Sequence, residues 1–179
     1  GSDVRTEIAL DFKKILAGDP FFLDGAWTAD VCDKVTRHMD LCSQFHLPVI
    51  HFVDCPGFAV GVKAETAGVT RAGVRAMTAI YQADVPVCSI VIRKAYGLAG
   101  SAMMNQSRTK WRYCWPSGDW GSLPMAGGIE AAFRKELAEA EDPEALKAQL
   151  YKKFDAIRSP FRTAESFYAE EIIDPRDTR

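Results

Sequence analysis

Two short runs of mostly apolar, β-branched residues predict strands near the centre of the chain, at residues 48–53 and 85–92. Continuous apolar runs of this length are typical of strands buried on both faces of a parallel sheet. Between them, residues 64–82 have helical spacing, with an apolar side made of Val69, Gly73, Ala76, Met77 and Ile80. This order predicts a strand–helix–strand crossover, whose functional edge lies beyond the carboxyl ends of its strands.

The same patterns predict the flanking elements. Weak helical spacing marks residues 3–17, and residues 18–27 read as a turn whose Phe21, Phe22 and Leu23 we expect to pack against the core. Thr28 is expected to cap a helix that runs to about residue 45. Its apolar side is Val31, Val35, Leu41, Cys42 and Phe45. A third strand is predicted at residues 110–116, a polar turn at 117–123, and helices at 125–140, 142–157 and 163–169.

Both predicted strand ends carry glycine turns, at residues 54–58 and 96–100. The second turn opens a helix, so its first main-chain amides lack partners within the helix and lie at the positive end of the helix dipole. Small residues at Gly97, Ala99 and Gly100 would let a ligand oxygen approach the main chain closely. This arrangement suits developing negative charge on a thioester-type substrate. The residue types leave open the alternative that the glycines only permit tight packing of strand against helix.

Two other chemistries compete for this stretch. Asp54 to Gly57 matches the Asp-x-x-Gly turn of a GTPase, but the sequence contains neither GxxxxGK[ST] nor Asn-Lys-x-Asp. A dinucleotide site is weaker still, because GxGxxG does not occur and no acid follows at the required offset. The oxyanion interpretation is therefore preferred.

The composition narrows the class of protein. The chain has 179 residues, a 47% apolar fraction and a net charge of −2, values typical of one globular domain. The interspersed charges predict neither a nucleic-acid partner nor a membrane surface, and no apolar run approaches the ~18 residues that span a bilayer. We expect free thiols in a reducing compartment, the cytoplasm or the mitochondrial matrix, and no metal site. The cysteines are Cys32, Cys42, Cys55, Cys88 and Cys114.

Four blocks in order carry a resemblance to a known family: residues 47–58, 85–100, 112–116 and 170–179. They resemble the carboxyltransferase (beta) subunit of biotin-dependent acyl-CoA carboxylases, of the propionyl-CoA and acetyl-CoA type. Residues 19–45 also resemble the family segment that precedes the first block. The family has two related halves, and this chain resembles the second, carboxyl-terminal half. The resemblance implies one α/β domain of crotonase-like β-β-α superhelix fold over residues 18–179, preceded by a poorly matched lead-in segment at residues 1–17.

The resemblance also implies a mechanism. A carboxyl group passes from carboxybiotin to the α carbon of a short acyl-CoA, while the biotin ureido oxygen becomes negatively charged. In the family, main-chain amides of the turn at Gly97, Leu98 and Ala99 meet that oxygen. The implied pocket around it is Pro56, Gly57, Phe58, Gly61, Tyr96, Gly100 and Ser101. The implied partners are the amino-terminal carboxyltransferase half, a biotin carboxylase and biotin carrier subunit, and further copies in a homo-oligomer (a hexamer in the family).

Two residues depart from the family pattern. Leu98 stands where the family usually has glycine, and Ser101 stands where many members have an Asp that influences acyl-chain choice. Arg93 and Lys94 could meet CoA phosphates, but strand-end cations are more often paired or solvated. His51 reads as a core residue rather than a base. Alternatives that stay open are a decarboxylase subunit of the same family, a biotin-independent enoyl-CoA hydratase or isomerase, and a non-catalytic assembly domain.

Overall fold

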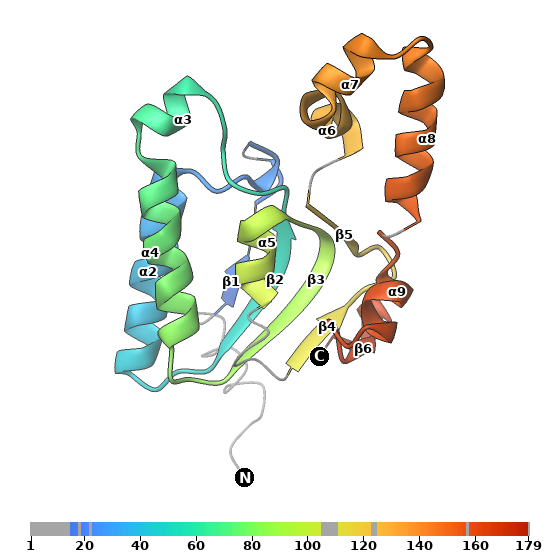
Figure 1. Ribbon diagram of the computed structural model, residues 1–179. Helices are drawn as coiled ribbons and strands as arrows, with labels where there is room; N and C mark the ends of the chain where they lie inside the picture. The colour runs from blue at the N-terminus through green and yellow to red at the C-terminus, as the bar shows by residue number, and fades with distance from the viewer. Residues whose placement is uncertain are drawn as a thin grey trace.

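The computed structural model describes residues 15–17, 19–21, 23–104, 111–122, 125–156 and 158–178. Over these residues the chain forms a six-stranded, wholly parallel sheet (Figure 1). Five strands lie in the order β1 (Ile15–Ala17), β2 (Val49–Cys55), β3 (Val87–Tyr96), β4 (Trp111–Cys114) and β6 (Glu171–Ile172). The short strand β5 (Asp119–Gly121) pairs with the carboxyl end of β3. The predicted parallel crossover at β2 and β3 is confirmed.

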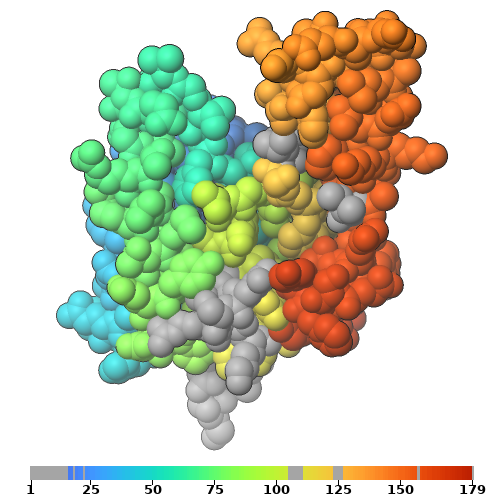
Figure 2. All heavy atoms as spheres, in the orientation of Figure 1, coloured from blue at the N-terminus to red at the C-terminus, as the bar shows by residue number. Residues whose placement is uncertain are grey.

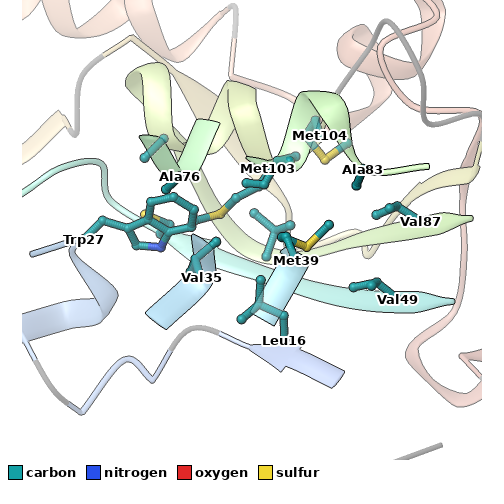
Figure 3. Close-up of a cluster of buried hydrophobic side chains, with 14 of the residues drawn as sticks. Leu16, Trp27, Val35, Met39, Val49, Ala76, Ala83, Val87, Met103 and Met104 are labelled. Carbon is teal, nitrogen blue, oxygen red and sulfur yellow. The ribbon is translucent and has the colours of Figure 1, made fainter. Parts of the chain in front are cut away.

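Helices α2 (Ala29–Gln44), α4 (Val69–Gln82) and α5 (Gly97–Met104) bury the core against one face of the sheet. Figure 3 shows this core, in which helix residues such as Met39 and Met103 meet strand residues such as Val49 and Val87. The prediction that the central strands are buried on both faces is wrong for β2. Its exposure alternates at the start of the strand, where Ile50 is 39% exposed, because the described helices lie on the other face.

The predicted helix after Thr28 is confirmed, and the Thr28 hydroxyl accepts the Val31 N–H at 3.3 Å as its cap. Its buried face differs from the predicted one. Leu41 and Phe45 are exposed, whereas Cys32 and Met39 are buried. The helix therefore presents a slightly rotated stripe to the sheet, because the packing of β2 and α4 selects which apolar residues are covered.

The lead-in part of the chain departs most from the sequence-based prediction. Residues 15–17 form the parallel strand β1, so the predicted helix is wrong there, and residues 3–14 lie outside the described residues. In the following turn, which contains the 3-10 helix η2 (Leu23–Gly25), Phe21 is 99% exposed and Leu23 is 58% exposed. The expectation that these two side chains pack against the core is wrong, and Phe22 lies outside the described residues.

Glycine breaks one predicted helix in two. The segment at residues 64–82 is divided into α3 (Val62–Thr66) and α4, and Gly68 between them has a left-handed conformation with φ 74°. Such a conformation is available to glycine at little cost, so the chain can turn here and start a second helix. The buried side of α4 is mostly the predicted one: Val69, Gly73, Ala76 and Ile80.

Three helices between β5 and α9 stand apart from the sheet in Figure 1: α6 (Met125–Ala132), α7 (Arg134–Glu139) and α8 (Pro143–Asp155). We call residues 125–155 the helical arm. Its helices pack on one another, with the Phe133 and Phe154 rings 5.8 Å apart and Lys147 Nζ 2.8 Å from Glu130 Oε1. The chain then enters α9 (Pro160–Glu165), β6 and the 3-10 helix η3 (Pro175–Asp177).

The predicted segments at residues 110–123 and 125–169 differ in detail. Asp119–Gly121 is a strand rather than part of a polar turn, and the helix at 125–140 is divided at Phe133. The last helix begins at Pro160 instead of residue 163, because proline suits the first turn of a helix. In the described ranges, no helix is long and apolar enough to cross a membrane.

Replacing Gly100 with alanine should destabilise this chain by about 1–3 kcal/mol, the usual cost of overpacking a core. A Cβ at this position would lie 2.4 Å from the carbonyl carbon of Ala95, so the main chain of β3 or α5 has to move. This cost should exceed the roughly 1 kcal/mol that alanine contributes through its higher helix propensity. Urea unfolding of the chain measures it. The neighbouring Ser101→Ala exchange is the control and should change the unfolding free energy by less than about 0.5 kcal/mol.

Candidate functional site

The glycine turn after β3 forms the amino end of α5, as the sequence predicted. Gly97 has φ 60°, a left-handed conformation that lets the chain leave the strand and enter the helix within one residue. The first amides of α5 have no carbonyl of the same helix to bond, and they carry the positive end of its dipole. Leu98 is 67% exposed, so this helix end reaches the surface. Figure 2 shows α5 in the hollow between α3–α4 and the helical arm.

The first glycine turn lies against the second. A Cβ on Gly57, whose φ is 119°, would lie 3.7 Å from the Tyr96 carbonyl oxygen. Trp27 fixes this turn through two main-chain bonds, donating its N–H to the Gly57 carbonyl at 3.0 Å and accepting the Ala59 N–H at 2.9 Å. The structure therefore brings together the two turns that the sequence analysis singled out, and adds a third segment around Trp27.

Phe58 packs against the hydrophobic core. Its ring meets the Trp27 ring edge-on at 5.9 Å and lies over Gly73 of α4, where a Cβ would be only 2.7 Å from the ring. Gly73 is therefore small because Phe58 occupies the adjoining space. Phe58 is partly buried, and its assignment to the pocket of the second turn stays a prediction.

A cavity of about 250 Å³ lies on the other side of α5. Gly97 lines it together with Gly100 and Ser101, two of the residues that the resemblance assigns to the pocket, whereas Pro56, Gly57, Phe58 and Gly61 are not among its described lining residues. The Tyr96 side chain bonds instead to Asp119 and Arg158. The sequence analysis missed the opposite wall, which is Trp120, Gly121, Thr163 and Tyr168. No local signal marks these residues, because β5 and α9 meet α5 only in the folded chain.

The cations at the end of β3 are paired within the chain. Arg93 Nη2 lies 3.1 Å from Asp54 Oδ2, and its guanidinium also lies 3.7 Å from Asp24. Lys94 bonds to Asp24 through its ammonium and to Asp54 Oδ1 through its main-chain N–H at 3.2 Å. The hydrogen bond from Arg93 to Asp54 raises the pKa of the Arg93 guanidinium above its ordinary value. Both residues therefore form ion pairs within the chain, as is usual for cations at the end of a strand.

Burial makes the cysteine thiols of the neighbouring strands poor nucleophiles. Burial raises the pKa of the Cys55 thiol and of the Cys114 thiol to about 11, so both remain protonated at neutral pH. All the cysteines are free thiols, as predicted. Within the described part of the chain, no cluster of His, Cys, Asp or Glu could hold a metal ion. His51 is 3% exposed, and burial lowers its pKa to about 3, which agrees with a neutral core histidine.

The arrangement can therefore stabilise an anion through main-chain donors beside a small neutral cavity. Its lining combines main-chain edges, a hydroxyl at Ser101 and the aromatic residues Trp120 and Tyr168. Among the described lining residues there is no carboxylate, which an enoyl-CoA hydratase or isomerase needs as its acid and base.

Comparison with known proteins gives relatives of one kind. The sequence matches the carboxyl transferase domain family over residues 14–179. It is 34% identical over 167 residues to the methylmalonyl-CoA carboxyltransferase 12S subunit of Propionibacterium freudenreichii subsp. shermanii. It is 33% identical over 171 residues to the propionyl-CoA carboxylase beta chain of Saccharopolyspora erythraea, and 31% identical over 166 residues to the methylmalonyl-CoA decarboxylase subunit alpha of Veillonella parvula.

Solved structures give the same result. A crystal structure of the transcarboxylase 12S hexamer, with methylmalonyl-coenzyme A and methylmalonic acid bound, superposes with a TM-score of 0.81 at 32% identity. The beta subunit of P. aeruginosa geranyl-CoA carboxylase superposes with a TM-score of 0.78 at 23% identity, which supports the fold alone. The predicted crotonase-like α/β fold is confirmed. The chain is covered to 92% in the three curated alignments but spans only about a third of those relatives, 31–32% of their length.

The buried His51 predicts a loss of stability in acid. Its pKa of about 3 in the folded chain is lower than the ordinary value of 6.5, so the unfolded chain binds a proton that the folded chain excludes. The contribution of His51 is complete above pH 6.5 and is lost as pH falls from 6.5 toward 3. At about 1.4 kcal/mol per pH unit, lowering the pH from 7.5 to 5 should remove about 2 kcal/mol through this residue.

Urea unfolding at the two pH values measures this effect. The His51→Gln exchange, which removes the titrating ring, should make the unfolding free energy less dependent on pH by about the same amount. An identical pH dependence in both proteins would mean that His51 gains a proton without unfolding.

Proposed function

The chain belongs to the carboxyl transferase domain family, and we propose that it forms the biotin-facing half of an acyl-CoA carboxyltransferase site. The observation that carries this proposal is the surface-reaching amino end of α5 beside a neutral cavity. The acyl group is proposed to be short, of the acetyl or propionyl type. The rest of the site is proposed to come from an amino-terminal carboxyltransferase half, since the chain spans about a third of its relatives.

The main-chain amides of Leu98 and Ala99 are the proposed catalytic groups, and they lie in the first turn of α5, directly after the left-handed Gly97. Bound carboxybiotin would supply the carboxyl group and a ureido oxygen on which negative charge develops, and its ureido nitrogen would take the α-proton that the acyl-CoA loses. The two amides donate to that oxygen, and the helix dipole adds to their field. Because they belong to the main chain, they are already oriented before substrate arrives, and each contributes roughly 3 kcal/mol to transition-state stabilisation. Leu98 retains the amide that the family's glycine would supply.

The cavity beside α5 is proposed to receive the acyl group. Ser101 and Gly100 form one wall, and Trp120 and Tyr168 form the other. Its volume of about 250 Å³ suits a group of a few carbon atoms. The serine in place of the family's Asp leaves this wall neutral.

The direction of the reaction is a second question. A relative named as a methylmalonyl-CoA decarboxylase subunit is 31% identical, close to the relatives named as carboxylases. The same pair of amides would serve both directions, because a transition state is shared by the forward and reverse steps. The biotin carrier is proposed to be a separate domain or subunit, and assembly into a homo-oligomer is proposed from the transcarboxylase hexamer.

The test is a carboxyl-transfer assay on the complete enzyme, meaning this chain together with the first half of the carboxyltransferase, with carboxybiotin as the carboxyl donor and acetyl-, propionyl- and butyryl-CoA as the acceptors. The decisive variant is Leu98→Pro. Proline fits the first turn of a helix and removes the N–H of residue 98 without adding bulk to the buried Ala99. Loss of one oxyanion donor should lower kcat about 100-fold or more.

The matched control is Leu98→Ala, which removes the same side chain but keeps the amide, and it should retain kcat within about threefold. A Leu98→Pro enzyme that is folded and nearly as active as Leu98→Ala would place the oxyanion elsewhere. An unmodified complete enzyme that transfers no carboxyl group to any of the three acyl-CoAs would refute the proposed function.

Ser101→Asp should change the preference among the three acyl-CoAs without abolishing biotin use. An Asp would add bulk and negative charge to the wall of the cavity, and a methylene in such a pocket is worth about 1–3 kcal/mol. The ratios of kcat/KM among acetyl-, propionyl- and butyryl-CoA should therefore shift by about 10-fold or more. Thr70→Asp, at an exposed position in the first turn of α4, is the control. Unchanged ratios would remove Ser101 from the acyl pocket.

A further inference from the structure

A cluster of three polar side chains lies behind the glycine turn. Tyr96, the residue before Gly97, donates its hydroxyl to Asp119 Oδ2. Arg158 donates from Nε to Asp119 Oδ1 at 2.6 Å and from Nη2 to the Tyr96 hydroxyl at 2.7 Å, and it also bonds to Asp119 Oδ2 through Nη2. The Arg158 guanidinium carbon lies 5.8 Å from the centre of the Tyr96 ring. Each member therefore contacts both others. We call these residues the basal cluster.

The basal cluster joins three separate parts of the chain. Tyr96 is the last residue of β3, Asp119 is the first residue of β5, and Arg158 follows α8. Asp119 and Arg158 thus flank the helical arm at its two roots (Figure 1). The contact continues to the turn itself, since a Cβ on Gly97 would lie 3.6 Å from the carbonyl oxygen of Ser122, which follows β5.

The turn needs such an anchor. Gly97 has φ 60° and no side chain that could make contacts. The orientation of the peptide between Gly97 and Leu98 therefore depends on the contacts of the neighbouring residues. The other end of α5 is already fixed, because the buried Ser89 hydroxyl donates to the Met103 carbonyl at 2.7 Å. Tyr96 is 3% exposed, and burial raises the pKa of its phenol, so the hydroxyl keeps its proton as a donor.

We propose that Arg158 is a positioning residue, which through Tyr96 and Asp119 fixes the amino end of α5 relative to the roots of the helical arm. Arg158 touches no reacting group in this arrangement. Its planar guanidinium meets the carboxylate through two nitrogens and the phenol through one of them, a geometry that lysine cannot reproduce. The catalytic consequence rests on the proposed function, whereas the structural consequence does not.

In the complete enzyme, Arg158→Met should lower kcat about 10- to 100-fold, because small errors in the placement of a catalytic group cost up to about 100-fold. The KM for the acyl-CoA should stay within about threefold. Tyr96→Phe keeps the ring and loses the two hydroxyl bonds, so a smaller loss in kcat is expected. Because both residues act through one cluster, the double variant should lose less than the product of the two single losses. Arg158→Lys should remain impaired, and ethylguanidinium added to Arg158→Ala should restore part of kcat.

The matched control is Arg75→Met. Arg75 Nη2 lies 2.8 Å from Asp33 Oδ1 in an exposed pair between α4 and α2. The variant therefore also loses a guanidinium–carboxylate pair, but at a place remote from the turn. It should leave kcat within about twofold of the unmodified enzyme. If Arg158→Met matches this control, or if Tyr96 and Arg158 act as independent residues, the proposal is overturned.

A second measurement needs no activity. In this 179-residue chain, amide hydrogen exchange in peptides covering residues 96–103 should be at least about 10-fold faster in Arg158→Met, with α4 unchanged. If Arg158→Met does not fold, kcat and amide hydrogen exchange are measured in Tyr96→Phe and Arg158→Lys instead, and these two variants test the proposal. Faster exchange in an inactive complete enzyme would keep the proposal and reject the carboxyltransferase function, whereas unchanged exchange in all cluster variants would reject the proposal.

Discussion

Main chain packs directly on main chain at the carboxyl edge of β2 and β3, and the site depends on this close approach. A Cβ on Gly25 would lie 2.6 Å from the Asp54 carbonyl oxygen, and one on Gly100 would lie 2.4 Å from the Ala95 carbonyl carbon. Neither distance is compatible with a side chain. The absence of these two side chains lets the Trp27 segment, the end of β2 and the start of α5 converge, and so exposes the amino end of α5 beside a cavity.

The charged side chains at this edge form ion pairs and hydrogen bonds with one another. Asp54 is buried, and it is satisfied by Arg93 and by the main chain of Lys94, while Asp24 takes the Lys94 ammonium. A buried carboxylate without such partners would be strongly destabilising, so Arg93 and Lys94 stabilise the fold at this edge. Main-chain donors at the amino end of α5 can stabilise negative charge that develops beside it, which fits a chemistry that needs an oxyanion site.

Much of this could be predicted from short segments of sequence. The periodicity predicted β2, β3, α2 and α4, because apolar spacing follows directly from which side of an element is covered. The turn at Tyr96–Gly97 and the helix after it were also predictable, since glycine permits the sharp turn from strand to helix and small residues let the helix pack closely on the strand. The family was recognisable from four blocks because those blocks coincide with the strand ends and the closing segment of the sheet.

Only the tertiary structure decided what those elements meet. From its place in a glycine turn, Phe58 was assigned to a pocket. In the structure its ring packs against Trp27 and Gly73, both of which are far from it along the chain. Trp120 and Tyr168 line the cavity although they lie far from α5 along the chain. Arg158 joins Tyr96 across 62 residues, and no local pattern encodes such a contact. By itself the sequence determined the central strands and helices and the glycine turn that opens α5, because these follow from local dihedrals and spacing. Long-range packing decided which residues line the cavity and which hold the turn in place. Many residues of the chain have similar polarity, and only the folded structure shows which of them reach the site.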